Sequence, residues 1–158
     1  MGASAGHTDY DYWLDALRDG RAFIKGTVLA ASVGNFSEIQ LLNPAGSGVN
    51  AVVFNLIAHD DLSANIQIRR HDAALATLVG AGVNLNIGGA AGACVLRTAT
   101  PAALDGTLLT VYNSNNSLNA TRFQWWVCEL APGVGVIGTP DIVNDEMSAE
   151  FRWIEIPA

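Results

Sequence analysis

Charge is scarce in this sequence. Asp, Glu, Lys and Arg make up only 15% of the 158 residues, whereas 50% are hydrophobic. Lys and Arg number 8 against 15 for Asp and Glu, which gives a net charge of −7. Nucleic-acid affinity depends mainly on Lys and Arg side chains that displace counterions, so we expect no nucleic-acid partner. The shortage of polar side chains also predicts that some apolar surface meets partner chains.

Long hydrophobic runs and cysteine are scarce as well. No stretch approaches the roughly 20 apolar residues that cross a membrane, so we expect no membrane partner. The first residues lack the basic and apolar regions of a signal peptide, which predicts synthesis and retention in a reducing cytoplasm. Cys94 and Cys128 are the two cysteines, and in that setting we expect them to be reduced and buried.

The residue types that usually carry catalysis form no convincing group. The three histidines include no His-x-His pair of the kind that binds metal in jelly-roll enzymes. A metal site at His59-Asp60-Asp61 is conceivable, although a polar strand end is the plainer interpretation. Cys94 lies in an apolar segment with nothing nearby to lower its pKa. We therefore expect no catalytic residue, no cofactor and no metal, and predict that the chain is not an enzyme.

Most of the chain has the pattern of short β-strands separated by turns. In residues 65–69, Ile66 and Ile68 face one side while Gln67 and Arg69 face the other. Strands are expected at residues 21–30, 36–42, 49–59, 65–69, 93–97, 107–112, 123–130, 133–137 and 150–156. About nine strands at this spacing predict an all-β sandwich or barrel. Residues 72–79 are ambiguous because Ala and Leu favour helix, and residues 80–92 are expected to form a loop or weak strands.

The first 20 residues are expected to form an arm, and residues 21–158 the β-sandwich domain. Tyr10, Trp13, Leu14 and Leu17 recur at three- and four-residue spacing, which predicts a short amphipathic helix that ends before Gly20. The arm could cover one end of its own sandwich or dock on an adjacent subunit, and the sequence favours neither.

Aromatic residues supply the candidate contacts with partners. Adjacent strand residues face opposite sides, so one of Trp125 and Trp126 should point outward. Large aromatic side chains dominate many interfaces. The candidate partner-interface residues are Tyr10, Tyr12, Trp13, Leu17, Trp125 and Trp126.

Three segments carry a resemblance to a known group of proteins. Residues 41–53, Leu-Leu-Asn-Pro-Ala-Gly-Ser-Gly-Val-Asn-Ala-Val-Val, have an apolar strand that ends in Asn-Pro and turns through glycines into a Val-rich strand. Residues 130–137 contain a Pro-Gly turn, and residues 151–157 read Phe-Arg-Trp-Ile-Glu-Ile-Pro. In this order they resemble the small jelly-roll virion structural proteins of tailed bacteriophages, the capsid decoration or cement proteins.

The resemblance implies a jelly-roll-like antiparallel β-sandwich with a short N-terminal arm. It also implies a homotrimer on the capsid surface of the virion, with the major capsid protein as partner. Two alternatives stay open. One is a tail fibre or baseplate module that binds host carbohydrate through residues 113–119 and an exposed tryptophan. The other, less favoured, is a metal-binding jelly-roll enzyme that uses His59, Asp60 and Asp61.

Overall fold

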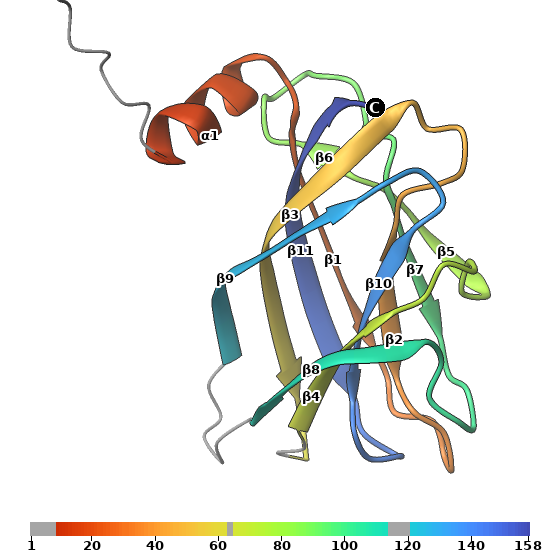
Figure 1. Ribbon diagram of the computed structural model, residues 1–158. Coiled ribbons are helices and arrows are strands. Elements are labelled where there is room, and N and C mark those ends of the chain that lie inside the picture. The colour runs from red at the N-terminus through yellow and green to blue at the C-terminus, as the bar shows by residue number, and fades with distance from the viewer. Residues whose placement is uncertain (1–8, 63–64, 114–120) are drawn as a thin grey trace, which may run out of the picture.

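A computed structural model describes residues 9–62, 65–113 and 121–158; the side chains of residues 9–11, 113 and 121–127 are outside the description. The described residues form a short helix and two antiparallel sheets, which pack face to face (Figure 1). The elements are α1 (Asp9–Arg18), β1 (Ala22–Leu29), β2 (Glu38–Leu42), β3 (Val49–Asp60), β4 (Asn65–Arg70), β5 (Thr77–Ala81), β6 (Val83–Asn84), β7 (Val95–Ala99), β8 (Thr107–Asn113), β9 (Thr121–Leu130), β10 (Gly135–Pro140) and β11 (Met147–Pro157). Within the described residues, no helix is long and apolar enough to cross a membrane.

The strand order is that of a jelly roll. One sheet has the order β6-β1-β11-β3-β9 and the other β5-β7-β2-β10-β4-β8. We call them sheet A and sheet B. The pairs β1 with β11, β2 with β10, β3 with β9 and β4 with β8 join strands from opposite ends of the chain. The chain therefore folds as one long hairpin whose paired strands form the two sheets of the sandwich, as in a jelly roll. This confirms the expected fold class.

Strands β5, β6 and β7 are inserted between β4 and β8, the two strands that close this hairpin. β5 and β7 extend sheet B on the side away from β8, and β6 extends sheet A beside β1. The ambiguous residues 72–79 contain no helix, because the chain there crosses sheet B and enters β5 at Thr77. Residues 80–92 hold the end of β5 and the two residues of β6, in agreement with the expectation of weak strands.

Apolar side chains fill the space between the two sheets. Trp153 is fully buried, and its ring stacks on that of Phe23 with centroids 5.9 Å apart. Gly82, between β5 and β6, has to be glycine because a Cβ atom there would clash with the Trp153 ring. The larger buried members of this core are Phe23, Ile39, Leu41, Val53, Leu56, Ile66, Ile68, Leu96, Leu130, Val136, Met147, Phe151 and Trp153.

The Asn-Pro turn after β2 has the role that its sequence suggested. Gly46 and Gly48 both have positive φ angles, 79° and 73°, which glycine adopts without strain. The buried Asn43 side-chain amide donates hydrogen bonds to the carbonyls of Val49 and Leu130, each 2.8 Å long. Asn43 thus ties the start of β3 to the end of β9.

Glu155 holds the inserted strands from the other sheet. Its carboxylate accepts hydrogen bonds from the backbone N–H groups of Ala93 and Cys94 and from the Trp153 indole N–H, all 3.0 Å long. The carboxylate is buried but fully engaged, as buried charged groups need to be. The Glu155 side chain of β11 therefore fixes the position of the residues that lead into β7.

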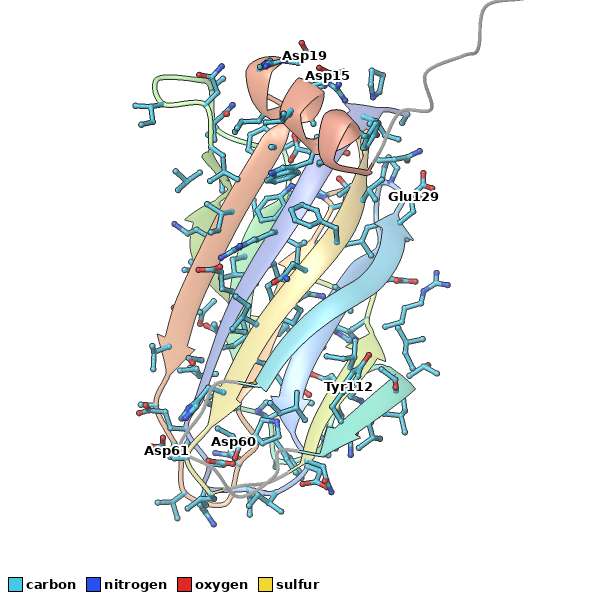
Figure 2. All side chains as sticks on the ribbon, turned by 90° about the vertical axis from the view of Figure 1, so that its left-hand side faces the viewer. Asp15, Asp19, Asp60, Asp61, Tyr112 and Glu129 are labelled. Atoms are coloured by element: carbon cyan, nitrogen blue, oxygen red, sulfur yellow. The ribbon has the colours of Figure 1, made fainter. Side chains whose placement is uncertain are left out.

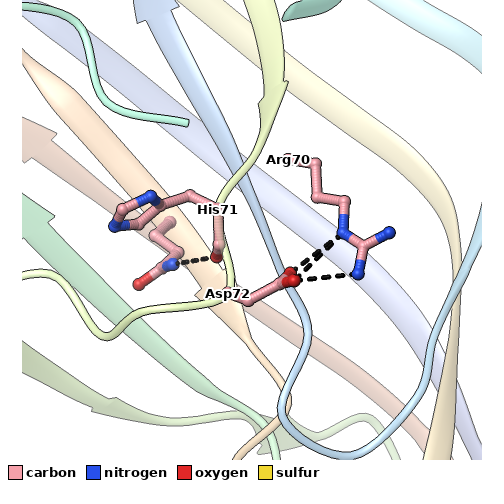
Figure 3. Close-up of polar contacts among 4 residues, drawn as sticks. Arg70, His71 and Asp72 are labelled. Carbon is pink, nitrogen blue, oxygen red and sulfur yellow. Dashed lines mark hydrogen bonds and ion pairs between the residues drawn. The ribbon is translucent and has the colours of Figure 1, made fainter. Parts of the chain in front are cut away.

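The insertion makes the chain cross the outer face of sheet B twice. Residues 71–76, the first strap, lead from β4 to β5, and residues 100–106, the second strap, lead from β7 back to β8. The Gln40 side chain on β2 holds the first strap. Its amide donates to the His71 carbonyl, the bond drawn to His71 in Figure 3, and to the Ala73 carbonyl. Its oxygen accepts the Leu75 N–H. Arg97 of β7 donates to the Leu75 carbonyl as well.

The second strap is held in the same way by two other side chains. Glu38 on β2 accepts the Asp105 N–H at 2.8 Å, and Arg69 on β4 donates to the carbonyls of Asp105 and Gly106 at 2.6 and 2.8 Å. Each strap thus has one polar side chain from β2 beneath it and one arginine from another strand of sheet B, β7 or β4.

Replacing Gln40 with methionine should release the first strap. The substitution keeps the size of the side chain but leaves the Leu75 N–H and two carbonyls without their partner, so the free energy of unfolding should fall by about 2–4 kcal/mol. Urea denaturation followed by circular dichroism measures the change. Gln67→Met, which removes a single hydrogen bond from Arg69, is the matched control and should cost less than about 1 kcal/mol. Equal losses in the two variants would contradict this role of Gln40.

Candidate interaction surfaces

Helix α1 packs against the outer face of sheet A in its own chain. The Trp13 ring lies 4.4 Å from that of Phe54 in β3, with an angle of 60° between the ring planes. Trp13 and Leu17 are half-buried against a small cluster that includes Ala16, Ala22 and Ile154. Figure 2 shows the helix across one end of β1, β11 and β3. In the single chain, residues 9–20 of the arm thus lie on their own sandwich; docking of the arm on an adjacent subunit stays a prediction.

The end of α1 is fixed by backbone geometry. Gly20 has a φ of 67°, a conformation that favours glycine, and the Arg21 N–H bonds to the Ala16 carbonyl at 2.8 Å. The Asn84 side chain of β6 also donates to the Gly20 carbonyl at 2.8 Å. These contacts set the direction in which the chain passes from α1 into β1.

The predicted interface residues are therefore in different environments. Tyr12 is 46% exposed, whereas Trp13 and Leu17 are partly covered by the chain's own sheet. The side chains of Tyr10, Trp125 and Trp126 lie outside the described residues. The backbone of both tryptophans belongs to β9, opposite a register shift between Val53 and Asn55 of β3. Their role in an interface stays a prediction, and residues 113–119 of the carbohydrate alternative lie largely outside the described residues.

The His59-Asp60-Asp61 sequence lies at the end of the sandwich opposite α1, as Figure 2 shows for the two aspartates. Asp145 accepts the N–H groups of Asp61 and Leu62 at 3.0 and 3.1 Å. Burial is the main cause that raises the pKa of the Asp145 carboxyl, and the charges of Asp60 and Asp61 act in the same direction. No three His, Cys, Asp or Glu residues within the described parts of the chain are grouped to hold a metal ion. This end is organised around the turn after β3.

Both cysteines are free thiols. Cys94 is buried and Cys128 is half-buried. Burial raises the pKa of the Cys94 thiol, assisted by the charge of Glu155, and burial raises that of Cys128 to about 12. A thiol with a raised pKa carries almost no thiolate at neutral pH and is a poor nucleophile.

The two arginines at the end of β4 have different roles. Arg70 forms an exposed ion pair with Asp72 at 2.8 Å (Figure 3). The Arg70 guanidinium holds the pKa of the Asp72 carboxyl below its usual value. Arg69, by contrast, binds carbonyls of the second strap.

The edge strand β8 presents apolar side chains that sequence reasoning did not select. Leu108, Leu109 and Val111 are 47%, 51% and 46% exposed. β8 pairs with β4 along one side only and forms an edge of sheet B. The doublet Leu108-Leu109 could have indicated an exposed apolar side chain, because adjacent strand residues face opposite sides of a sheet. The position of β8 at an edge, however, depends on the whole topology.

A second apolar feature lies beside α1. A groove of about 510 Å³ is lined by Leu17, Arg18, Leu85, Asn86 and Ile87. Ile87 is 98% exposed at the tip of the loop that follows β6. The Asn86 side chain donates to the Arg18 carbonyl at 3.2 Å, which ties this loop to the helix.

The contact between Trp13 and Phe54 can be tested by a double-mutant cycle. Trp13→Ala, Phe54→Ala and the double variant should give a coupling free energy of about 1 kcal/mol, as for other packed aromatic pairs. Because both rings belong to one chain, the coupling should not change over a hundredfold range of protein concentration. A coupling that grows with concentration would place the helix on a neighbouring copy.

Comparisons with known proteins add no relative. No protein-family model, no curated protein and no solved structure matches this chain.

Proposed function

We propose that this chain is a structural protein of a tailed-bacteriophage virion, a capsid decoration protein that binds and stabilises the lattice of the major capsid protein. The resemblance of residues 41–53, 130–137 and 151–157 to such proteins supports the proposal. The strand order supports it as well, because jelly rolls are common in capsid proteins, although lectins and cupins also use them.

The filled interior supports binding through the outside of the molecule. Some β-barrel proteins hold small ligands between their strands, in a space lined by inward side chains. Here Trp153, Phe151 and Phe23 occupy the middle of that space and are at most 4% exposed. The apolar side chains that stay exposed to solvent lie on the exterior, where another protein can cover them.

The observation that carries the proposal is the exposed edge of sheet B. Natural proteins commonly protect edge strands with charged residues or proline. β8 reads Thr-Leu-Leu-Thr-Val-Tyr-Asn and has neither. It exposes Leu108, Leu109 and Val111 on one short strand, and exposed apolar side chains at an unprotected edge are a place where another protein can bind. Tyr12 and Ile87 add exposed apolar area near α1.

Virion particles from the genome that encodes the chain provide the direct test. We expect the chain on their capsids at a fixed stoichiometry, measured by mass spectrometry and by cryo-electron microscopy. Val111→Lys should lower the occupancy about tenfold or more, since a lysine in a buried apolar contact costs at least about 1.4 kcal/mol.

Val33→Lys is the matched control, because Val33 is 95% exposed in the loop between β1 and β2. This variant should decorate particles as the unaltered chain does. Particles without the chain, or equal occupancy for the two lysine variants, would contradict the proposal or the role of β8 in it.

The proposed oligomer is a homotrimer. Light scattering on the purified chain should give three times the mass of one chain, and the value should hold on dilution to micromolar concentration. A mass equal to one chain at every concentration would contradict a preformed trimer.

A further inference from the structure

Glu38 is a carboxyl group buried in an unusual place. It lies on the outer side of β2, where the neighbouring Ile39 points into the core, and the second strap covers it completely. One carboxyl oxygen accepts the Asp105 N–H at 2.8 Å. The other oxygen is buried and has no hydrogen-bond partner among the described residues. A buried carboxylate normally has both oxygens engaged, so the site suits a neutral carboxyl better than a charged one.

The surrounding charges do not compensate an ionised Glu38. Arg69 lies near enough to favour the charge, but its guanidinium donates to the Asp105 and Gly106 carbonyls and to the Gln67 side chain. The Asp105 carboxylate on the strap opposes ionisation. The register partner Ala99 of β7 is uncharged, and β10 has no ionisable side chain. The charged groups that face Glu38 are therefore one arginine engaged elsewhere and one repelling aspartate.

This environment shifts the protonation equilibrium towards the neutral acid. Burial is the largest cause, and it raises the pKa of Glu38 from 4.5 to about 7. The hydrogen bond from the Asp105 N–H acts in the opposite direction but does not balance the burial. Leaving the second oxygen without a partner costs less free energy in the neutral acid than in the anion.

We propose that Glu38 is a protonation-controlled latch that holds the second strap over sheet B when it is neutral and releases the strap when it ionises. Opening the strap admits water to the carboxylate and moves it away from the Asp105 carboxylate. Local opening of a loop requires far less free energy than unfolding the sandwich, so it is the accessible response. The inference does not depend on the proposed function.

Release of the strap would reach the exposed edge of sheet B. The strap enters β8 directly at Thr107, and Gly106 at the junction has a φ of 69°. A Cβ atom at Gly106 would clash with the Arg70 carbonyl oxygen, so the closed strap lies tightly against β4. The latch therefore sets how firmly the first residues of β8, including the exposed Leu108, are held to their neighbour.

The direction of the pH effect follows from the raised pKa. Below about pH 4.5 the carboxyl is neutral whether the strap is open or closed, and the closed state is at its most stable. Between that pH and about 7 the open state loses its proton first, so the closed state becomes less favoured as the pH rises. The equilibrium constant for closing the strap changes by at most roughly 300-fold in total, and the change is complete above about pH 7.

Hydrogen–deuterium exchange tests the latch on the full chain. Exchange in peptides that cover residues 100–110 is measured at pH 5.5 and 8.5 and corrected for the intrinsic pH dependence. We expect at least a tenfold loss of protection at pH 8.5 in the unaltered chain. Glu38→Gln, which keeps an oxygen to accept the Asp105 N–H but cannot ionise, should stay protected at both pH values.

Glu150→Gln is the matched control, because Glu150 pairs with Arg152 on the outer face of sheet A. It should show the pH dependence of the unaltered chain. The latch is wrong if Glu38→Gln retains that dependence or if the unaltered chain has none. Carbon-13 NMR of the unaltered chain gives a second readout that needs no variant. One glutamate carboxyl should titrate near pH 7, and titration of every glutamate near pH 4–5 would overturn the inference.

Discussion

The outward polar side chains of β2 are the constraint on which the rest of this molecule depends. Three strands are inserted into the hairpin that closes the jelly roll, so the chain has to cross sheet B twice. Each crossing brings backbone N–H and carbonyl groups onto a covered surface, where they need partners. Gln40 and Glu38 provide these partners from β2, Arg97 provides them from β7, and Arg69 provides them from β4. A sheet face that is usually solvated thus becomes an interior surface.

The same device explains how a chain with few charges holds its loops. Glu155 accepts hydrogen bonds from the residues that lead into β7, and Asp145 accepts them from the turn after β3. Asn43 joins the start of β3 to the end of β9. Each is a buried polar side chain that bonds to backbone groups far away in the sequence. The acidic residues are therefore partly structural, and the exterior is left with apolar area at β8 and beside α1. That distribution is the physical basis for proposing assembly with other proteins.

The sequence predicted the strands well because their signal is local. Alternation placed Ile66 and Ile68 in the core, and the Asn-Pro turn and its glycines behaved as expected. The straps could not be predicted in this way. Gln40 looks like an ordinary outward strand residue, and its partner Leu75 is 35 positions away. The Ala and Leu residues near position 75 favour helix by intrinsic propensity, but tertiary contacts with β2 override this preference.

The candidate surfaces were predicted unevenly for the same reason. The amphipathic pattern of residues 10–17 identified Trp13 and Leu17 as contact residues, but it could not say whose surface they contact. The exposed edge of β8 depends on the order of strands in sheet B, which no local pattern encodes. The most direct measurement of the account is amide exchange by NMR at pH 5.5. The Leu75 and Asp105 N–H groups should be far more protected than the other strap amides that lack a backbone partner, because Gln40 and Glu38 bind them. Exchange of both at the rate of an unstructured chain would contradict the account.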